Sequence, residues 1–187
     1  MRGFLRFGAY VKKRIMIVGV PGSGKSTLAR LLGERFSLPV FHMDQTHWKV
    51  DWVERSNLDK ILMALAVEAA DAWVFEEGMS LTYKSPVARA DVLIWHDLPV
   101  GLRLWRATKR LFRYLGKADG RPDLMKGCVE RMHPETLAFY WCIRTNRYSA
   151  RNKIEQLVTD TLDDLGVVHL RTPSKQRRWL ASLPDEG

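Results

Sequence analysis

Residues 19–26 read GVPGSGKS, and this stretch constrains the fold more than any other part of the chain. It matches the pattern G-x-x-x-x-G-K-[ST] of a phosphate-binding loop, which joins a buried strand to a helix. The flanks fit, since 14–18 is short, apolar and β-branched, and 27–36 has apolar residues at helical spacing. A chance glycine turn would not be expected to bring eight residues into register between a strand and a helix.

The chemistry of such a loop is directed at phosphate. Its backbone N–H groups point inward as an anion nest, and the N-terminus of the following helix adds a partial positive charge. Lys25 then reaches the β- and γ-phosphates, and the Ser26 hydroxyl helps to hold Mg²⁺. Because Lys25 is expected to project into the ligand, its replacement by alanine should leave the fold intact. The residues predicted to bind nucleotide are Gly19, Val20, Pro21, Gly22, Ser23, Gly24, Lys25, Ser26 and Thr27.

We predict ATP and Mg²⁺ as the cofactors. ATP is favoured over GTP because the chain has no N-K-x-D-like guanine signature.

Length and composition indicate one domain of ordinary globular type. The chain has 187 residues, of which 46% are hydrophobic and 27% charged, enough for a core without disulfides or metal. It has no apolar run of 18 or more residues, so no membrane-spanning segment and no membrane partner are expected. Its two cysteines, Cys128 and Cys142, suit neither a disulfide framework nor a zinc site, which favours a cytoplasmic location. A monomer and a homodimer are both compatible with this composition.

Residues 1–13 are basic and contain no acid, so a targeting segment has to be considered. They lack the continuous apolar stretch and the small-residue cleavage site of a secretory signal. We interpret 1–13 as a basic N-terminal extension and 14–187 as the folded domain. An organellar or membrane-touching role of the extension is the alternative.

Strands and helices alternate along the chain, which is the pattern of a parallel sheet covered on both faces. Besides 14–18, short apolar strands are predicted at 38–43, 73–75, 91–97 and 167–170. Further helices are predicted at 57–70, from 100 onward, from 134 onward, at 153–165 and at 175–183. The fold class expected is therefore α/β with a five-stranded parallel sheet.

The net charge of +9 is concentrated in one helical segment. Its arginines recur at spacings of 3, 4 and 3 and form one stripe: Arg103, Arg106, Arg110 and Arg113. Trp105 and Phe112 are spaced to join the leucines on the other side of the helix. Since the planar fork of arginine grips one phosphate bidentately, we predict a clamp by Arg106 and Arg110 on the phosphoryl group. A solvated basic face and a nucleic-acid patch are the alternatives.

Acids end two of the predicted strands, at the edge where open α/β sheets place ligands. Asp44 follows the strand at 38–43, and its alternative role is a helix N-cap. Glu76 follows the strand at 73–75 and could hold Mg²⁺ through water, as a Walker B acid does, or be an ordinary strand-end carboxylate. Asp97 is a reserve candidate, and a cap of the arginine helix is its expected role.

These motifs together resemble the small P-loop kinases of the adenylate kinase-like superfamily, in particular the group called DNA topology modulation protein or adenylate kinase-related kinase. The matching stretches are 19–27, 42–44 with Trp48 and 51–53, 73–76, 93–99, 120–123 and 130–131. The resemblance implies a three-layer P-loop NTPase fold with a helical lid at about 101–150. It also implies that Asp44 handles the acceptor, as base or anchor, and that 171–175 packs the adenine.

The chain departs from this resemblance after the third strand. The family leads us to expect a small residue and then Asn after the strand-end acid, whereas this chain has Glu77, Gly78 and Met79. Glu76 and Glu77 therefore both stay open as the acid that serves Mg²⁺.

The sequence thus predicts a phosphotransferase that moves the γ-phosphate of ATP to a small acceptor, which could be a nucleoside, a nucleotide or another metabolite. Two alternatives belong to other classes. A nucleic-acid-associated ATPase would be stimulated by duplex DNA with a steep inverse salt dependence. A nucleotide-binding regulator would bind ATP and form no product with any acceptor.

Overall fold

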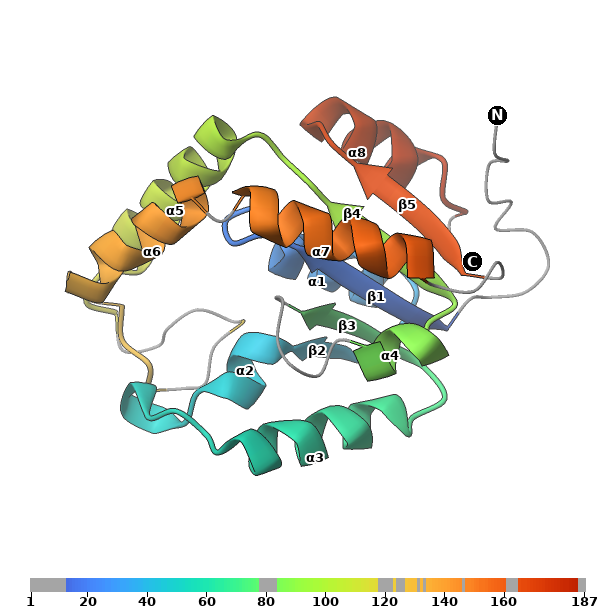
Figure 1. The fold of residues 1–187 in the computed structure, drawn as a ribbon, viewed down its shortest axis with the longest axis horizontal. Helices are drawn as coiled ribbons and strands as arrows, with labels where there is room; N and C mark the ends of the chain where they lie inside the picture. The colour runs from blue at the N-terminus through green and yellow to red at the C-terminus, as the bar shows by residue number, and fades with distance from the viewer. Residues whose placement is uncertain are drawn as a thin grey trace.

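The computed structural model of the protein describes residues 13–77, 84–117, 123, 127–130, 132, 134–145, 147–160 and 165–184. Its centre is a five-stranded parallel sheet in the order β2-β3-β1-β4-β5 (Figure 1). The strands are β1 (Arg14–Gly19), β2 (Val40–His42), β3 (Trp73–Glu77), β4 (Val92–His96) and β5 (Gly166–Leu170). The predicted parallel sheet is confirmed, and each strand lies within two residues of its expected bounds.

Helices cover both faces of the sheet, so the molecule has three layers. Helices α1 (Lys25–Arg35) and α8 (Pro173–Ala181) lie on one face, and α3 (Asn57–Glu68), α4 (Lys84–Arg89) and α7 (Arg147–Asp160) on the other (Figure 1). Strand side chains alternate between the faces. Ile15 and Ile17 accordingly lie in the core beneath α1, whereas Met16 and Val18 lie in the core beneath α3 and α7. A strand buried on both faces is therefore a continuous apolar run, as 15–18 of β1 are.

Two further helices project from one end of the sheet as an arm. These are α5 (Val100–Tyr114) and α6 (Pro134–Thr145), which pack against each other (Figure 1). The Arg110 guanidinium lies over the Phe139 ring, 5.7 Å from its centroid, and joins the two helices. Much of the segment between α5 and α6 lies outside the described residues, namely 118–122, 124–126, 131 and 133.

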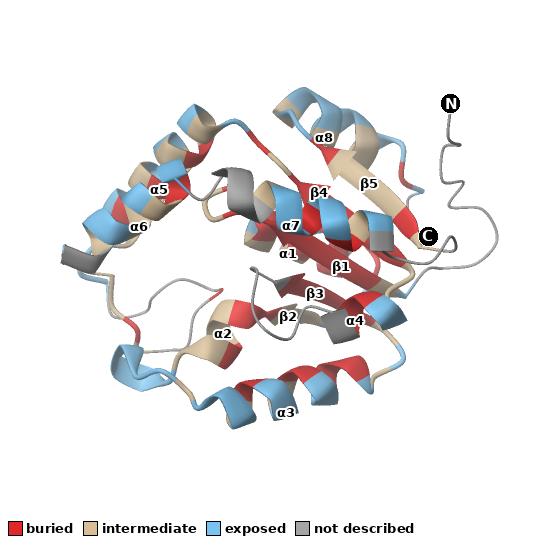
Figure 2. Cartoon of the chain, in the orientation of Figure 1, coloured by how far each residue is buried: buried red, intermediate tan, exposed pale blue. Residues whose placement is uncertain are grey.

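Helix α5 is buried along a line that includes one of its arginines. Its buried residues are Arg103, Ala107 and Leu111, spaced four apart (Figure 2). Arg103 is only 2% exposed, whereas Trp105 and Phe112 are 62% and 70% exposed. The arginine stripe is therefore not wholly solvent-facing.

The role expected for Asp97 was also wrong. The N-cap residue of α5 is Pro99, and no side chain caps this helix. The Asp97 carboxylate instead lies 3.1 Å from Nε2 of His169 on β5.

Three short elements were not predicted. One is α4 (Lys84–Arg89), and the other two follow β2. Helix α2 (Met43–His47) starts directly after β2, and a 3-10 turn follows at Val50–Trp52. Asp44 is therefore in the first turn of a helix, not at the end of a strand, and the N-cap position belongs to His42.

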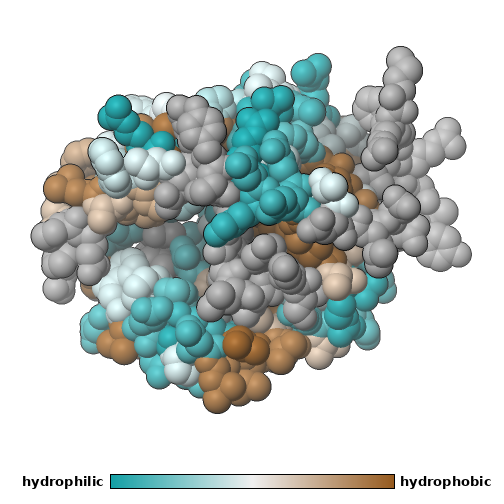
Figure 3. Space-filling view, in the orientation of Figure 1, coloured by the Kyte–Doolittle hydropathy of each residue, from teal (hydrophilic) through white to brown (hydrophobic). Residues whose placement is uncertain are grey.

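The surface of α3 is unusually apolar. Leu58, Ile61, Leu62 and Leu65 are all exposed and follow helical spacing, and they colour the lower edge of the molecule brown in Figure 3. None of the helices within the described ranges is both long and apolar enough to cross a membrane.

Candidate active site: the phosphate loop

The loop after β1 lies where an open parallel sheet binds ligands. β1 is the central strand, with β3 on one side and β4 on the other. At such a topological switch point the carboxyl ends of the strands leave a crevice. The chain turns through this crevice at 20–24 and enters α1 at Lys25. The phosphate loop, the sheet and its three layers together give the chain the α/β fold of P-loop NTPases.

The start of α1 is built to receive an anion. Its N-cap residue, Gly24, has a left-handed backbone with φ 96° and has no side chain with which to cap the helix. The first turn also contains no acid. The first N–H groups of a helix have no intrahelical partner, and here no side chain of the loop occupies them. They are left to bind phosphate oxygens.

Glycine at positions 22 and 24 permits α5 to lie directly against the loop. A Cβ atom at Gly22 would come within 2.8 Å of the Arg103 carbonyl oxygen. A Cβ atom at Gly24 would come within 2.7 Å of Nη1 of Arg106. Both positions also have φ angles in the left-handed region, which other residues seldom adopt. The loop sequence therefore serves the packing of the arm as well as phosphate binding.

Lys25 takes part in a buried row of polar side chains. Its Nζ atom lies 3.6 Å from Oε1 of Glu76, and Oε2 of Glu76 lies 3.1 Å from Nδ1 of His42. All three residues are less than 9% exposed. His42 is the last residue of β2, Glu76 lies in β3 and Lys25 is the first residue of α1, so the row runs across the carboxyl ends of two neighbouring strands to the phosphate loop. Of the two acids left open by the sequence, Glu76 is the one that faces Lys25; the Glu77 side chain lies outside the described residues.

Glu76 is held in its ionised form despite its burial. Removal from water raises the pKa of this carboxyl group, but the hydrogen bond from His42 and the charge of Lys25 lower it by more. The resulting pKa lies below the ordinary value for glutamate. The charge of Asp123 acts in the opposite direction, which places this second acid near the same site. Asp123 is 8% exposed, and its proximity to Glu76 was not expected from the sequence.

Arg106 reaches the loop from α5. Its Nη1 atom donates a hydrogen bond of 2.6 Å to the Ser23 carbonyl oxygen. Burial lowers the pKa of Arg106, although guanidinium remains charged in proteins. The Ser23 hydroxyl is buried and has no hydrogen-bond partner within the described part of the chain. The structure thus brings Arg106 to the phosphate loop but places Arg110, one turn later, against α6.

Ser26 and Asp44 complete the set of predicted residues. Ser26 is the second residue of α1 and is half-buried, while Thr27 is exposed. Asp44 is half-buried in the first turn of α2, two residues after His42. The Trp48 and Trp52 rings beyond it meet edge-on at 5.6 Å, and Nε1 of Trp52 donates to the Val129 carbonyl oxygen at 3.0 Å.

His96 is a site residue that sequence reasoning missed. It ends β4 beside the loop, is fully buried, and lies 3.2 Å through Nε2 from Oε1 of Gln176. No described residue forms a hydrogen bond with its Nδ1 atom. Burial, helped by the charges of Lys25 and Arg106, lowers the pKa of His96 to about 4. His42 and His96 both end strands at the ligand-binding edge, and that position was the signal that could have found them.

The oxygen donors near the loop fit Mg²⁺. This ion prefers oxygen ligands, keeps several of its waters and is usually held by one or two carboxylates together with substrate phosphates. The Ser26 hydroxyl and the buried Glu76 carboxylate have that character. Among the described residues no group of three or more His, Cys, Asp or Glu side chains could hold a metal by itself.

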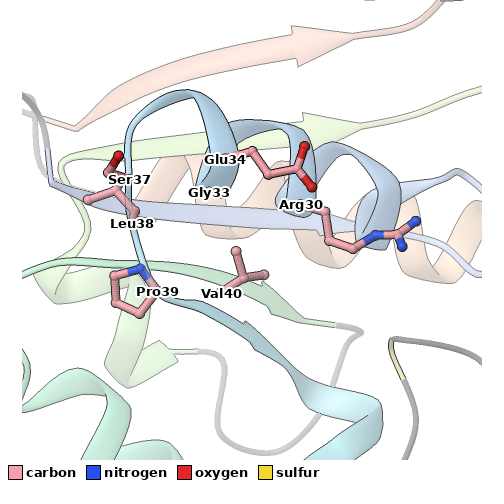
Figure 4. A pocket seen from close by; sticks show the side chains of 7 residues that line it. All are labelled: Arg30, Gly33, Glu34, Ser37, Leu38, Pro39 and Val40. Carbon is pink, nitrogen blue, oxygen red and sulfur yellow. The ribbon is translucent and has the colours of Figure 1, made fainter. Parts of the chain in front are cut away.

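A hollow elsewhere on the molecule contains none of these residues. It is lined by Arg30, Gly33, Glu34, Ser37, Leu38, Pro39 and Val40 (Figure 4). These residues lie in the second half of α1, in the link that follows it and at the first residue of β2, so the first turn of α1 separates them from the phosphate loop.

No family model and no curated protein matches the chain. Among solved structures it is similar to a sugar kinase from Janibacter sp. HTCC2649, with 14% identity, a TM-score of 0.49, and 91% of this chain and 94% of that chain covered. It is similar to deoxyadenosine kinase from M. mycoides with bound dATP, with 14% identity, a TM-score of 0.46, and coverage of 89% and 97%. It is also similar to shikimate kinase from Acinetobacter baumannii in complex with shikimate, with 15% identity, a TM-score of 0.43, and coverage of 81% and 96%.

Proposed function

We propose that the protein is a P-loop kinase, a phosphotransferase that moves the γ-phosphate of ATP to a small acceptor. The observation that carries this proposal is the convergence of three separate elements on one phosphate loop. α1 supplies Lys25, β3 supplies Glu76 and α5 supplies Arg106, within the contacts described above.

The residues divide the work between binding and charge stabilisation. Backbone N–H groups of 19–26 cradle the phosphates, and Lys25 leaves Glu76 to contact the β- and γ-oxygens. Arg106 exchanges the Ser23 carbonyl for an oxygen of the transferring group, where its fixed donors stabilise developing charge. Mg²⁺, held by Ser26 and through water by Glu76, would neutralise charge on the same oxygens when bound. Burial of Lys25, Glu76 and His96 keeps bulk water away from this centre.

Asp44 is assigned to the acceptor. It stands in α2, the helix that begins where β2 ends, so it lies on the β2 side of the loop. There it would orient the acceptor hydroxyl or phosphate, or remove its proton. Arg110 is assigned to the closed state of the arm. In that state the segment at about 101–150, which contains α5 and α6, acts as a lid. Within the adenylate kinase-like superfamily, we assign the chain to the adenylate kinase-related group named above.

A second candidate is favoured by one observation. The outer face of α5 carries exposed Trp105 and Phe112 on a helix rich in arginine. Aromatic side chains beside basic ones are a platform on which single-stranded nucleic acid can stack. A nucleic-acid-associated ATPase is therefore the alternative function.

Labelled ATP separates these functions. The protein is incubated with γ-labelled ATP and Mg²⁺, with a panel of nucleosides, nucleotides and small hydroxylated metabolites, and with single-stranded or duplex DNA. A kinase transfers label to a member of the panel and does so at a rate that DNA does not change. Label released only as inorganic phosphate, at a rate that DNA increases and salt decreases, would replace the kinase with the ATPase.

A further inference from the structure

We propose that His42 is a positioning residue for the metal site: it fixes one oxygen of Glu76 so that the other can pass from Lys25 to the Mg²⁺ shell. This inference rests on the proposed function, because it names the partner that makes Glu76 usable. His42 itself touches neither nucleotide nor metal in this account.

The geometry divides the two Glu76 oxygens between two partners. Oε2 lies 3.1 Å from Nδ1 of His42, and Oε1 lies 3.6 Å from Nζ of Lys25. A carboxylate can only accept, so His42 donates through Nδ1–H. In the register of the two strands, His42 and Glu76 stand directly opposite each other. The backbone of the sheet therefore fixes this hydrogen bond, whereas Lys25 reaches Oε1 with a long and flexible side chain.

This division matters once Lys25 turns to the phosphates. Oε1 then loses its partner in a place that is almost free of solvent, since Glu76 is 6% exposed. A buried charged acceptor without a donor is costly, and a water of the Mg²⁺ shell is the donor that the site can offer. Without His42, both oxygens could turn toward Lys25 and compete with the phosphates for it. Outer hydrogen bonds of this kind typically affect metal affinity about 10- to 100-fold.

The same residue joins the metal site to the acceptor side. His42 is the last residue of β2 and the N-cap position of α2, and Asp44 follows two residues later. A side chain bonded to Glu76 thus sets the point from which α2 starts.

The test titrates ATP into the protein in buffer with Mg²⁺ and in buffer with EDTA. The ratio of the two ATP affinities is the gain due to Mg²⁺. His42→Leu removes the donor, whereas His42→Asn places an amide N–H where Nδ1 stood. We expect His42→Leu to cut the gain about 10- to 100-fold, with ATP affinity in EDTA changed little. His42→Asn should restore most of the gain. Thr46→Val is the matched control. Thr46 is buried in α2, and both hydrogen bonds described for its hydroxyl go to Met43, not to Glu76.

A second comparison shows whether His42 acts through Glu76. In a Glu76→Gln background, His42→Leu should cause no further loss of the Mg²⁺ gain, because the group that it positions is already altered. If His42→Leu folds poorly, His42→Phe, which also lacks the donor, replaces it in both backgrounds. Equal losses in Mg²⁺ and in EDTA, or additive losses in the Glu76→Gln background, would overturn the proposal. No binding of ATP by the wild type would overturn the proposed function as well.

Discussion

Lys25 has a structural partner as well as a predicted ligand. From the sequence we expected the Lys25 side chain to project into the nucleotide, so that its replacement by alanine would leave the fold intact. In the structure Lys25 is 8% exposed and faces the buried charge of Glu76 at 3.6 Å, so we now expect its loss to affect stability as well. A lost binding function in a Lys25 variant must therefore be separated from lost stability.

Removing Lys25 should destabilise the protein. Breaking a buried ion pair from one side leaves an uncompensated charge, at a cost of about 3–5 kcal/mol. We expect Lys25→Ala to lower the free energy of unfolding by an amount of this order in denaturant titrations. Lys25→Ala/Glu76→Gln should regain most of the loss because the stranded charge is gone. If Lys25→Ala is as stable as the wild type, the pair contributes nothing to the fold.

Asp44→Asn should separate binding from chemistry. The amide keeps the size of the side chain but loses its charge and basicity. We expect ATP affinity near that of the wild type and phosphoryl transfer lowered by about 10²–10⁴-fold, the usual contribution of a general base. Transfer rates and ATP titrations on the same samples check this. Unchanged transfer combined with a lower melting temperature would mean that Asp44 only stabilises the first turn of α2.

At the scale of elements, local patterns predicted what depends on neighbours in sequence. The run at 14–18, the loop and the helix after it could be read because each signal lies within a few residues. The partners of His42 and His96 lie 34 and 80 positions away, so no local pattern could pair them. The buried face of α5 could not be identified from its own sequence for a related reason. Its burial depends on contact with Gly22 and Gly24, which lets Arg103 pack inside and leaves Trp105 exposed.

The arm makes Arg106 and Arg110 unequal. Only Arg106 contacts the loop, so Arg106→Lys should lower phosphoryl transfer by about 10–10³-fold, because lysine lacks the planar fork. Arg110→Lys should lower it less, since Arg110 lies over Phe139. Arg113→Lys is the matched control on the same helix, with an exposed side chain. DNA affinity is measured on the same variants. Full transfer by Arg106→Lys, with DNA binding lost in Arg106→Ala and Arg110→Ala, would favour the nucleic-acid ATPase.

At the scale of the whole molecule, the phosphate site and the fold share a dependence on pH. The pKa of His96 is about 4 in the folded protein, against 6.5 ordinarily. Between these values the unfolded chain binds a proton that the folded protein excludes, so stability falls as the pH decreases from 6.5 towards 4. At about 1.4 kcal/mol per pH unit, the whole effect is about 3 kcal/mol.

Unfolding titrations across this pH range test that dependence. His96→Asn keeps a polar side chain but cannot titrate, so its stability should change much less between pH 6.5 and pH 4. His47→Asn is the control. Burial is also the main cause that lowers the pKa of His47, but the His47 side chain is 34% exposed. It should leave most of the dependence in place. The same pH dependence in His96→Asn and the wild type would show that His96 is not the group responsible.

The measurement that bears most directly on the whole account is a titration of ATP and Mg²⁺ into the wild type and Lys25→Met. Methionine keeps the apolar stem and removes the charge, and folding of the variant is verified by circular dichroism under the same conditions. Charge-assisted contacts contribute about 1.5–3 kcal/mol each, so the variant should bind ATP about 10- to 100-fold more weakly. Equal ATP affinity of the folded variant and the wild type would contradict the assignment of the loop after β1 as the triphosphate site.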